Sequence, residues 1–484
     1  MASPIDVVIM AAGKGTRMKS DLPKVLHRLG GRALLQHVID CATQLSARQA
    51  VLITGHGASE VEAAIDRPSA AAGGLRLQFV RQEPQLGTGH AVQQAMPLLA
   101  DDGVTLVLSG DVPLLQAATL QALLDVAAGG QLALLTLTMA DPTGYGRIVR
   151  QAGADGGPLP AVSAIVEQKD ASEPQREIKE IYSGIMVAPT RLLRGWLARL
   201  DNQNAQREYY LTDIVKFAVA DGVAVLAHQI SDAAQVAGVN SPAQLAGLER
   251  IYQLRLATAL MEQGVRLADP TRLDVRADRR AGAPGTLVCG RDVEIDVNCI
   301  FEGAVRLGDG VKVGANCVIA SASIAAGAVI YPFSHIDGEM LGVEVGEGAR
   351  VGPFARLRPG ARLGAEVHIG NFVEVKNSTL ARGAKANHLA YLGDASVGER
   401  VNYGAGSITA NYDGANKHRT VIEADVHIGS NCVLVAPVTI GAGGTVGGGS
   451  TITRNTAAGA LSIGRGRQVS IPNWRRPLKK QGGS

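Results

Sequence analysis

The feature that most restricts the fold of this chain is a six-residue period in its second half. After about residue 285 an aliphatic residue recurs at every sixth position, and many of these residues are followed directly by glycine. Such a repeat is typical of a left-handed parallel β-helix, in which each short strand forms one face of a triangular prism and points its aliphatic side chain inward. The repeating positions are Leu307, Val313 and Ile319, then Val345, Val351, Leu357, Leu363, Ile369 and Val375, then Ile422, Ile428, Leu434, Ile440, Val446 and Ile452.

Composition agrees with this prism. The chain has 59 glycines and only 4% aromatic residues, which suits tight turns between small residues. The repeat is interrupted between Asn411 and Arg419, where we expect a loop that leaves a coil.

The first half has a different pattern, in which short apolar runs alternate with amphipathic stretches. This alternation predicts an α/β domain with a Rossmann-like, mostly parallel sheet and helices on its faces. A helix is expected over 241–264, with Ser241 as its N-cap and Pro242 at its first position. We therefore predict an α/β domain over 1–240, a linker helix over 241–264 and the β-helix over 265–484. The expected strands are Val7 to Met10, Ala50 to Thr54, Leu77 to Val80, Thr105 to Leu108 and Leu132 to Leu137.

Length and charge exclude several classes of protein. With 484 residues, of which 46% are hydrophobic, the chain can fill more than one core. The net charge of +3 is small, and the only basic cluster is a short tail, so we expect no nucleic-acid partner. The apolar run near the N-terminus is too short for a signal peptide or a membrane span. The tail contains Arg475, Arg476, Lys479 and Lys480.

The cysteines bear on compartment and on metal chemistry. Five cysteines form no CxxC pair and no metal-ligand spacing, which favours free thiols in a reducing compartment. We therefore expect a cytoplasmic protein without membrane insertion, in which any metal is bound by oxygen ligands. The cysteines are Cys41, Cys289, Cys299, Cys317 and Cys432.

A glycine-containing loop follows the first expected strand. Gly13 and Gly15 would let backbone N–H groups approach phosphates closely, and Arg17 and Lys24 would supply positive charge against a triphosphate. The loop lacks the third glycine of a dinucleotide fingerprint and does not fit the P-loop pattern. Asp111 follows the strand that ends near Leu108, where a carboxylate can hold Mg²⁺ at the edge of an open sheet. Taken alone, Asp111 is equally compatible with a helix cap or a turn.

Several motifs resemble, in order and nearly end to end, one bacterial enzyme family. The chain is similar to the bifunctional N-acetylglucosamine-1-phosphate uridyltransferases/glucosamine-1-phosphate N-acetyltransferases. The resemblance implies acetyl-CoA-dependent N-acetylation of glucosamine 1-phosphate, then uridylyl transfer from UTP that gives UDP-N-acetylglucosamine and pyrophosphate. This product is a precursor of peptidoglycan and lipopolysaccharide. The motifs are AAGKGTRM, PKVL, QLGTGHA, SGDVPL, DPTGYGRI, EYYLTD, NHLAYLGDA and NYDGANK.

For the first domain the resemblance implies a uridylyltransferase site. Asp111 and Asn240 would carry Mg²⁺, and Arg17 would stabilise the departing pyrophosphate. Two positions depart from the family: Ser109 stands where an aromatic residue is common, and Tyr182 stands where Asn is common. The residues implied to bind nucleotide and sugar are Met10, Ala11, Ala12, Gly13, Lys24, Gln82, Gly87, Thr88, Ser109, Gly110, Asp111, Gly146, Glu167, Tyr182 and Asn240.

The second domain carries a candidate base. His388 interrupts the inward aliphatic register, so we expect it to face a groove rather than the prism core. Polar residues on neighbouring coils would stack with it into one surface, a pocket for a phosphosugar. The resemblance implies that His388 is the general base, that glucosamine 1-phosphate is bound by Arg358, Lys376, Tyr391 and Asn402, and that acetyl-CoA contacts Ala405, Asn411, Tyr412, Ser430, Gly448 and Arg465.

The resemblance also implies a homotrimer with sites between neighbouring prisms. A flat apolar prism face needs to be covered, which agrees with self-association. Gly448 stands where the family usually has Ala, and we expect this change to be harmless because the contact comes from the backbone.

Two other functions compete with this interpretation. A single-activity nucleotidyltransferase for glucose or mannose 1-phosphate, with a β-helix that only assembles subunits, would not need the residues around His388. A non-catalytic trimeric binding module would leave Asp111, Arg17 and Lys24 without a role.

Overall fold

The chain folds into two compact units. The computed structural model describes residues 3–66, 75–151, 161–278 and 282–477. The first unit contains the chain up to Leu256 and a short segment ending at Pro284, and the second contains Ala257 onward without that segment. The division falls inside helix α8 (Pro242–Glu262), so the sequence-based limits at 240 and 265 stay predictions. Among the described residues, no helix is long and apolar enough to cross a membrane.

The first unit is built on a mixed sheet of nine strands. Its order is β11-β7-β10-β6-β1-β4-β5, with β8 and β9 attached through β10. Strand β1 pairs in parallel with both β4 and β6, and β10 is antiparallel to β6 and β7. All five strands expected from the apolar runs are confirmed. The strands are β1 (Ile5–Met10), β4 (Gln49–Thr54), β5 (Arg76–Arg81), β6 (Val104–Ser109), β7 (Leu132–Thr138), β8 (Gly146–Arg150), β9 (Val162–Val166), β10 (Glu180–Pro189) and β11 (Val225–Ile230), with a separate hairpin of β2 (Arg28–Leu29) and β3 (Arg32–Ala33).

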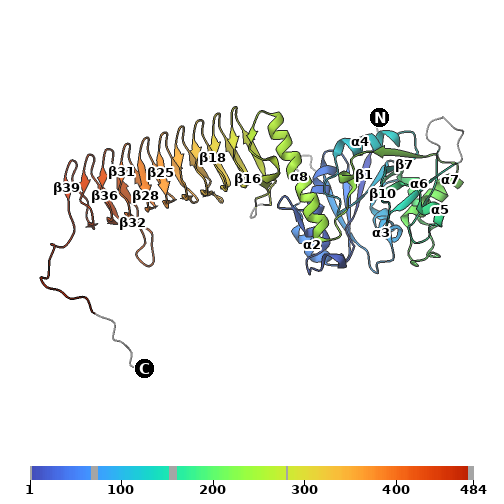
Figure 1. The fold of residues 1–484 in the computed structure, drawn as a ribbon. Coiled ribbons are helices and arrows are strands. Elements are labelled where there is room, and N and C mark those ends of the chain that lie inside the picture. The colour runs from blue at the N-terminus through green and yellow to red at the C-terminus, as the bar shows by residue number, and fades with distance from the viewer. Residues whose placement is uncertain (1–2, 67–74, 152–160, 279–281, 478–484) are drawn as a thin grey trace, which may run out of the picture. The chain divides into compact units, whose positions relative to one another are not determined.

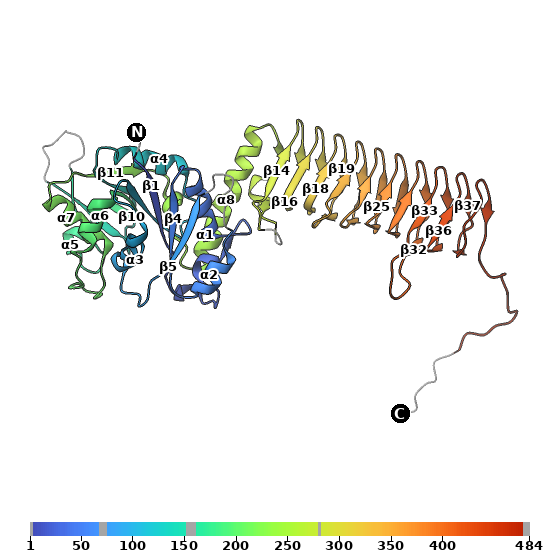
Figure 2. The ribbon, with the colours of Figure 1, turned by 180° about the vertical axis from the view of Figure 1, so that it is seen from behind.

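Helices cover both faces of this sheet (Figures 1 and 2). One apolar core joins α1 and α4 to one face, and a second joins α3, α6 and α7 to the other. Helix α8 begins as predicted, because the backbone N–H of Gln244 donates to Ser241 Oγ at 3.2 Å. The helices are α1 (Leu34–Thr43), α2 (Ala58–Ala64), α3 (Thr88–Ala95), α4 (Ala117–Val126), α5 (Glu173–Arg176), α6 (Thr190–Leu197), α7 (Ile214–Ala220) and α8.

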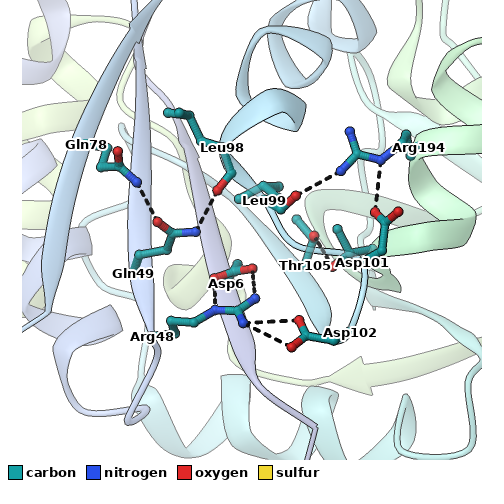
Figure 3. A network of polar contacts seen from close by, with 11 residues as sticks. Asp6, Arg48, Gln49, Gln78, Leu98, Leu99, Asp101, Asp102, Thr105 and Arg194 are labelled. Atoms are coloured by element: carbon teal, nitrogen blue, oxygen red, sulfur yellow. Dashed lines mark hydrogen bonds and ion pairs between the residues drawn. The ribbon is translucent and has the colours of Figure 1, made fainter.

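A polar network ties the amino ends of the central strands together (Figure 3). Asp6, at the start of β1, is fully buried and receives two hydrogen bonds from Arg48, at 2.6 and 3.0 Å. Arg48 also reaches Asp102, and Gln49 bonds the carbonyl of Leu98. Removing one partner of such a buried pair typically costs about 3–5 kcal/mol. This edge therefore serves stability, and the carboxyl ends of β1 and β6 lie at the opposite edge.

The second unit is a parallel β-helix whose strands stack in register. One face is a sheet of eleven strands, and the other two faces share a sheet of seventeen. Most successive coils repeat after 17 or 18 residues, as in the pairs Val351 with Ile369 and Ile369 with Ala386, and a few are longer, as in the pair Asn402 with His427. The eleven are β12 (Arg266–Leu267), β15 (Glu294–Ile295), β17 (Lys312–Val313), β19 (Val329–Ile330), β22 (Arg350–Val351), β25 (His368–Asn371), β28 (Lys385–His388), β31 (Asn402–Tyr403), β34 (His427–Ile428), β37 (Thr445–Val446) and β39 (Leu461–Ser462).

The larger sheet alternates between the two remaining faces. Each strand pairs with the strand two further along the sheet, for example β23 with β26 and β26 with β29. Its strands are β13 (Leu273–Arg276), β14 (Thr286–Cys289), β16 (Cys299–Leu307), β18 (Val318–Ile324), β20 (His335–Asp337), β21 (Val343–Val345), β23 (Arg356–Leu357), β24 (Arg362–Leu363), β26 (Glu374–Lys376), β27 (Thr379–Leu380), β29 (Tyr391–Gly393), β30 (Ala395–Val397), β32 (Ile408–Ala410), β33 (Thr420–Ile422), β35 (Val433–Val435), β36 (Val438–Ile440) and β38 (Thr451–Ile452).

The hexapeptide positions behave as the sequence predicts. Every aliphatic residue named from the repeat is buried, with exposed fractions from 0% to 7%. The expected loop is also present, because the chain leaves the stack between β32 and β33 (Figure 1). The period of six is therefore the spacing of inward-facing side chains.

One corner of the prism carries an exposed apolar ridge, defined as Phe333, Phe354, Phe372 and Leu389. The rings of Phe333 and Phe354 are stacked with centroids 4.9 Å apart, and those of Phe354 and Phe372 are 5.4 Å apart. All of these residues have φ between 49° and 61° and are about half exposed or more. A left-handed backbone is unfavourable for bulky side chains. Asn298, Asn316 and Asn431 also adopt it, as small polar residues readily do.

Candidate functional sites

A cavity of about 400 Å³ opens at the carboxyl ends of β1 and β6. Its wall contains most of the residues expected to bind the nucleotide, which confirms that these distant segments meet at one place. Gly110 and Asn240 do not line it, and neither do Arg17 and the residues expected to bind the sugar. The cavity is lined by Met10, Ala11, Ala12, Gly13, Lys24, Val25, Gln82, Gln85, Gly87, Thr88, Ala91, Ser109, Asp111 and Glu208.

The loop before α3 is held rigidly against the cavity. Gln82 is buried and its amide donates to the carbonyl of Gly87 at 2.8 Å. Gly87 has φ of 108°, and a Cβ at this position would lie 2.7 Å from the carbonyl oxygen of Tyr209. Only glycine fits this approach. The hydroxyl of Thr88 accepts the N–H of Leu211 at 3.1 Å, which fixes the N-terminus of α3 at the cavity wall.

The two residues expected to hold a metal lie beside each other. Lys24 Nζ is 2.5 Å from Asp111 Oδ2 and 3.1 Å from Asn240 Oδ1, so both oxygens face one small volume. Arg17 also donates to Asn240 Oδ1, at 2.8 Å. A carboxylate and an amide oxygen around a bound ammonium are suitable donors for Mg²⁺, which prefers one or two protein oxygens together with substrate phosphates. The donor set therefore fits this ion. Among the described residues, no group of three His, Cys, Asp or Glu side chains could form a cage of its own.

The residues expected to bind the sugar form a separate group beside β8. Gly146 and Tyr182 are register partners, and a Cβ at Gly146 would lie 3.7 Å from Glu167 Oε1. Glu167 accepts the hydroxyl of Thr212 at 3.0 Å and lines a second cavity of about 500 Å³. Burial is the main reason that the pKa of Glu167 is raised. The Tyr182 hydroxyl is buried without a hydrogen-bond partner among the described residues, and burial raises its pKa well above the usual value.

In the β-helix, His388 is exposed, as its break from the inward register predicts. Its Nδ1 lies 2.8 Å from Asn371 Oδ1, on the preceding coil. An amide oxygen only accepts, so in the neutral ring the proton is on Nδ1 and the lone pair is on Nε2. Asn402, on the same face, bonds His427 at 3.0 Å. Asn371 was not identified from the sequence, although its position one coil before His388 is readable from the repeat.

The other sugar-binding candidates lie on a different face. Lys376 and Tyr391 belong to β26 and β29, and Arg358 directly follows β23 in the same stack, whereas His388 lies on β28 in the eleven-stranded sheet. The two faces meet at Leu389 of the ridge. Arg358 donates to Glu374 at 2.8 Å. A single prism therefore places the five candidate residues on two neighbouring faces, because the chain turns a corner between His388 and Tyr391.

Lys417 joins this cationic face from the loop between β32 and β33. Its amine contacts that of Lys376, and this contact is the main reason that the pKa of Lys376 is lowered. Burial and the charge of Arg358 lower the same pKa further. Like charges this close are unfavourable without an anion, so the cluster is suited to a phosphate. Lys417 lies in the NYDGANK motif but was not among the predicted residues.

The acetyl-CoA candidates are partly brought together along successive coils. The N–H of Asn431 donates to the carbonyl of Ala405, and the N–H of Gly449 donates to that of Ser430, both at 2.8 Å. Arg465 donates to the carbonyl of Gly448 at 2.6 Å. A Cβ at Gly448 would be 3.4 Å from its nearest neighbour, so the usual Ala fits there as well.

The remaining members of this set start the loop. Asn411 is buried and donates to Asp394, whereas Tyr412 is exposed. In the basic tail, Arg475 and Arg476 are exposed, and Lys479 and Lys480 lie outside the described residues.

Comparisons with known proteins agree with both halves. Residues 7–152 match the model of the MobA-like NTP transferase domain, and residues 342–377 and 419–454 match the bacterial transferase hexapeptide repeat. The chain is 80% identical over 479 residues to the bifunctional protein GlmU of Polaromonas naphthalenivorans (strain CJ2), with 99% of each chain covered. It is 72% identical to that of Albidiferax ferrireducens, covering 98% of this chain and all of that one. It is 54% identical to that of Janthinobacterium sp. (strain Marseille), covering 98% and 99%. The chain therefore belongs to the family of bifunctional GlmU proteins, in which a nucleotidyltransferase is joined to a hexapeptide acetyltransferase.

Proposed function

We propose that this bifunctional enzyme of UDP-N-acetylglucosamine synthesis performs its two transfers at two separate sites, one at the sheet edge of the first unit and one on the β-helix. The observation that carries the first assignment is the convergence of Lys24, Asp111 and Asn240 beside a cavity large enough for a nucleotide. The proposal for the second rests on the orientation of His388 by Asn371.

In the first site, the uridine nucleotide lies in the cavity beside Gln82, Gly87 and Thr88. Lys24 contacts the phosphates, and Arg17 neutralises the departing pyrophosphate, because phosphoryl transfer depends chiefly on positioning and charge stabilisation. Asp111 and Asn240 would hold Mg²⁺. The ion would supply positive charge that offsets the negative charge developing as the sugar phosphate attacks the α-phosphorus.

The acetylated sugar lies toward Gly146, Glu167 and Tyr182. The Tyr182 hydroxyl has no hydrogen-bond partner among the described residues, and an unsatisfied buried hydroxyl costs about 1–3 kcal/mol. A polar group of the sugar would satisfy it. Tyr182 thus supplies a polar contact where the family commonly has Asn.

In the second site, Nε2 of His388 takes a proton from the amine of glucosamine 1-phosphate as the nitrogen forms a bond to the acetyl carbon of acetyl-CoA. The thioester C–S bond then breaks, and coenzyme A leaves as the thiol with the proton that His388 returns. Asn371 keeps the ring in the tautomer that this step needs, because its oxygen retains the proton on Nδ1. Asn402 lies on the same face as His388. Arg358, Lys376, Tyr391 and Lys417 bind the phosphosugar from the neighbouring face.

The acetyl-CoA contacts then follow the coils beyond this site. Ala405, Ser430, Gly448 and Arg465 are linked along successive coils. Asn411 and Tyr412 approach from the loop.

The active form is a homotrimer assembled along the ridge. The ridge retains bulky residues in a left-handed backbone, and its exposed rings form a continuous apolar strip parallel to the prism axis. The strip on a second copy has the same spacing between coils, so the rings of the two copies can pack against each other along the whole strip. Since candidate residues lie on both sides of the ridge, a neighbouring prism would complete the acetyltransferase site.

We place the enzyme in the cytoplasm. Its substrates are all small molecules. The five cysteines form no disulfide, and four of them are buried, which suits a reducing compartment.

A pair of assays tests the two assignments. Purified full-length protein should convert UTP and N-acetylglucosamine 1-phosphate to UDP-N-acetylglucosamine in the presence of Mg²⁺. Separately, it should acetylate glucosamine 1-phosphate from acetyl-CoA. Pyrophosphate release without acetyl transfer would indicate a single-activity nucleotidyltransferase, and no turnover in either assay would indicate a binding module.

A further inference from the structure

The oxygens assigned to the metal already hold a cation of the protein itself. Lys24 Nζ contacts both Asp111 Oδ2 and Asn240 Oδ1. The side chains of Lys24 and Asp111 are only 15% and 16% exposed, so the pair is shielded from water. A mostly buried carboxylate without a partner would be costly. The ammonium therefore has the role that a bound metal would otherwise have.

The backbone fixes both sides of this contact. On one side, the N–H of Val239 donates to the Asp111 carbonyl at 3.0 Å, and a Cβ at Gly238 would lie 3.2 Å from Asp111 Oδ2. On the other side, Gly15 has φ of 60°, and a Cβ there would lie 2.6 Å from the Cβ of Lys24. The close passage of two glycines past these side chains makes the contact a property of the fold.

We propose that Lys24 is the resident cation of the Asp111–Asn240 pair in the nucleotide-free enzyme and leaves it only when a triphosphate binds. This inference rests on the proposed uridylyltransferase site. Lys24 is held by a flexible stem, so its ammonium can move from the carboxylate to a phosphate while the backbone stays in place. A triphosphate would attract the ammonium and would also supply the oxygens that Mg²⁺ needs.

The consequence is a coupling between nucleotide and metal. A divalent ion on the same two oxygens would lie next to the ammonium, and two cations so close repel strongly at the effective dielectric of a protein. A metal that binds alone must displace the Lys24 ammonium, which then loses its contacts without gaining new ones. When UTP binds as well, the displaced ammonium gains contacts with the phosphates. Because such coupling is reciprocal, the metal should strengthen UTP binding by the same factor.

Titration of the full-length protein with Mn²⁺, with free ion measured by electron paramagnetic resonance, tests this directly and requires no turnover. Without nucleotide, Lys24→Met should bind Mn²⁺ at least about tenfold more tightly than the parent, which corresponds to about 1.4 kcal/mol. After subtraction of the Mn²⁺ that UTP binds without protein, UTP should strengthen Mn²⁺ binding by a larger factor in the parent than in Lys24→Met, where only the phosphate oxygens contribute. Lys24→Gln provides the same test if Lys24→Met does not fold.

The matched control is Lys14→Met, which removes the same charge from the same loop at an exposed position. It should titrate like the parent. Equal Mn²⁺ affinity for Lys24→Met, Lys24→Gln and the parent without UTP would overturn the inference, as would equal tightening by Lys14→Met. Asp111→Asn distinguishes a failure of the role proposed for Lys24 from a failure of the metal site itself. If it abolishes Mn²⁺ binding with UTP while the Lys24 variants are unchanged, only the role of Lys24 fails. If Asp111→Asn binds Mn²⁺ like the parent with UTP, the metal site itself fails.

Discussion

The two units of this enzyme gather functional side chains in opposite ways. In the first, the carboxyl edge of a parallel sheet brings together residues that are far apart in sequence: Lys24 is 87 residues from Asp111 and 216 from Asn240. In the β-helix, neighbours such as Asn371 and His388 are one coil apart. A side chain on one face therefore contacts mainly the residues at the same position of the adjacent coils.

This difference has a consequence for how each site is completed. A sheet edge can collect a nucleotide site within one chain. A prism places its candidate base and its cationic residues on neighbouring faces, and we propose that a second prism completes the site. Changes in the first unit should therefore act within a subunit, and changes on the β-helix should act through assembly as well.

The largest expected effect is that of His388→Ala. Loss of a general base typically slows a reaction by roughly 100- to 10,000-fold, so acetyl transfer should fall by that factor while uridylyl transfer is unchanged. His335→Ala, an exposed histidine on β20, is the matched control and should behave like the parent. Acetyl transfer within a few-fold of the parent in His388→Ala would reduce the histidine to a surface residue.

Asp111→Asn should have an effect of about a thousandfold, confined to the other activity. The amide cannot neutralise a divalent ion, so several kcal/mol of charge stabilisation are lost in uridylyl transfer. Acetyl transfer should be retained. The control is Asp102→Asn, which removes the same charge at the opposite edge of the sheet. A comparable loss in both variants would point to damaged folding rather than to a metal site.

A change on the ridge tests the idea that only the β-helix site depends on assembly. The double variant Phe354→Asn/Phe372→Asn places at this corner a residue that suits a left-handed backbone better than Phe does. Each prism should therefore stay folded while the contact between copies is lost. Light scattering should show a monomer, and acetyl transfer should fall at least about tenfold, because a buried aromatic anchor typically contributes about 2 kcal/mol to an interface.

Uridylyl transfer should be unaffected in this ridge variant. Met340→Asn, at a more exposed apolar position of the same unit, should leave the assembly intact. A ridge variant that remains trimeric and fully active would show that the copies meet elsewhere.

The same contrast explains what the sequence could reveal. A buried strand and an inward-facing aliphatic residue each have a local period, so five of the strands of the first unit and all the hexapeptide positions named above were predictable. The face on which a polar residue lies depends on where each coil turns, which is why His388 and Tyr391 were expected on one surface and are found on two. Asn371 was missed because it lies outside the motifs quoted above, and its contact with His388 becomes visible only when the coils are stacked.

The features of the candidate sites that the sequence did not reveal depend on tertiary contacts. The sequence placed Lys24 near phosphates and Asp111 near a metal as separate expectations. It gave no sign that Lys24 and Asp111 contact each other, because the approach depends on the segment around Gly238, more than 100 residues further along. Likewise, the sugar-binding candidates form a separate group beside β8 because Gly146 pairs with Tyr182, and this pairing is not visible in the sequence.

The smallest expected effect concerns Lys417, which reaches the cationic face from a loop that interrupts the repeat. Its contact lowers the pKa of Lys376, so Lys376 loses its proton at a lower pH than an isolated lysine does. A phosphate is bound by the charged form, and affinity for glucosamine 1-phosphate should therefore decline as pH rises through this lowered pKa. Lys417→Met removes one cation and should raise KM several-fold at neutral pH.

The same substitution should move the alkaline rise in KM to higher pH, because Lys376 regains a pKa closer to its usual value of about 10.4. The amine of the substrate also titrates, but it does so equally in both proteins, so the difference between the two profiles isolates Lys376. Lys385→Met removes the same charge from β28 on the other face and should leave the profile in place. If Lys417→Met raised KM without moving the alkaline limb, Lys417 would act on the phosphate alone. If both variants moved the limb equally, the effect would come from the general charge of the prism, and the separation of its faces would have no functional meaning.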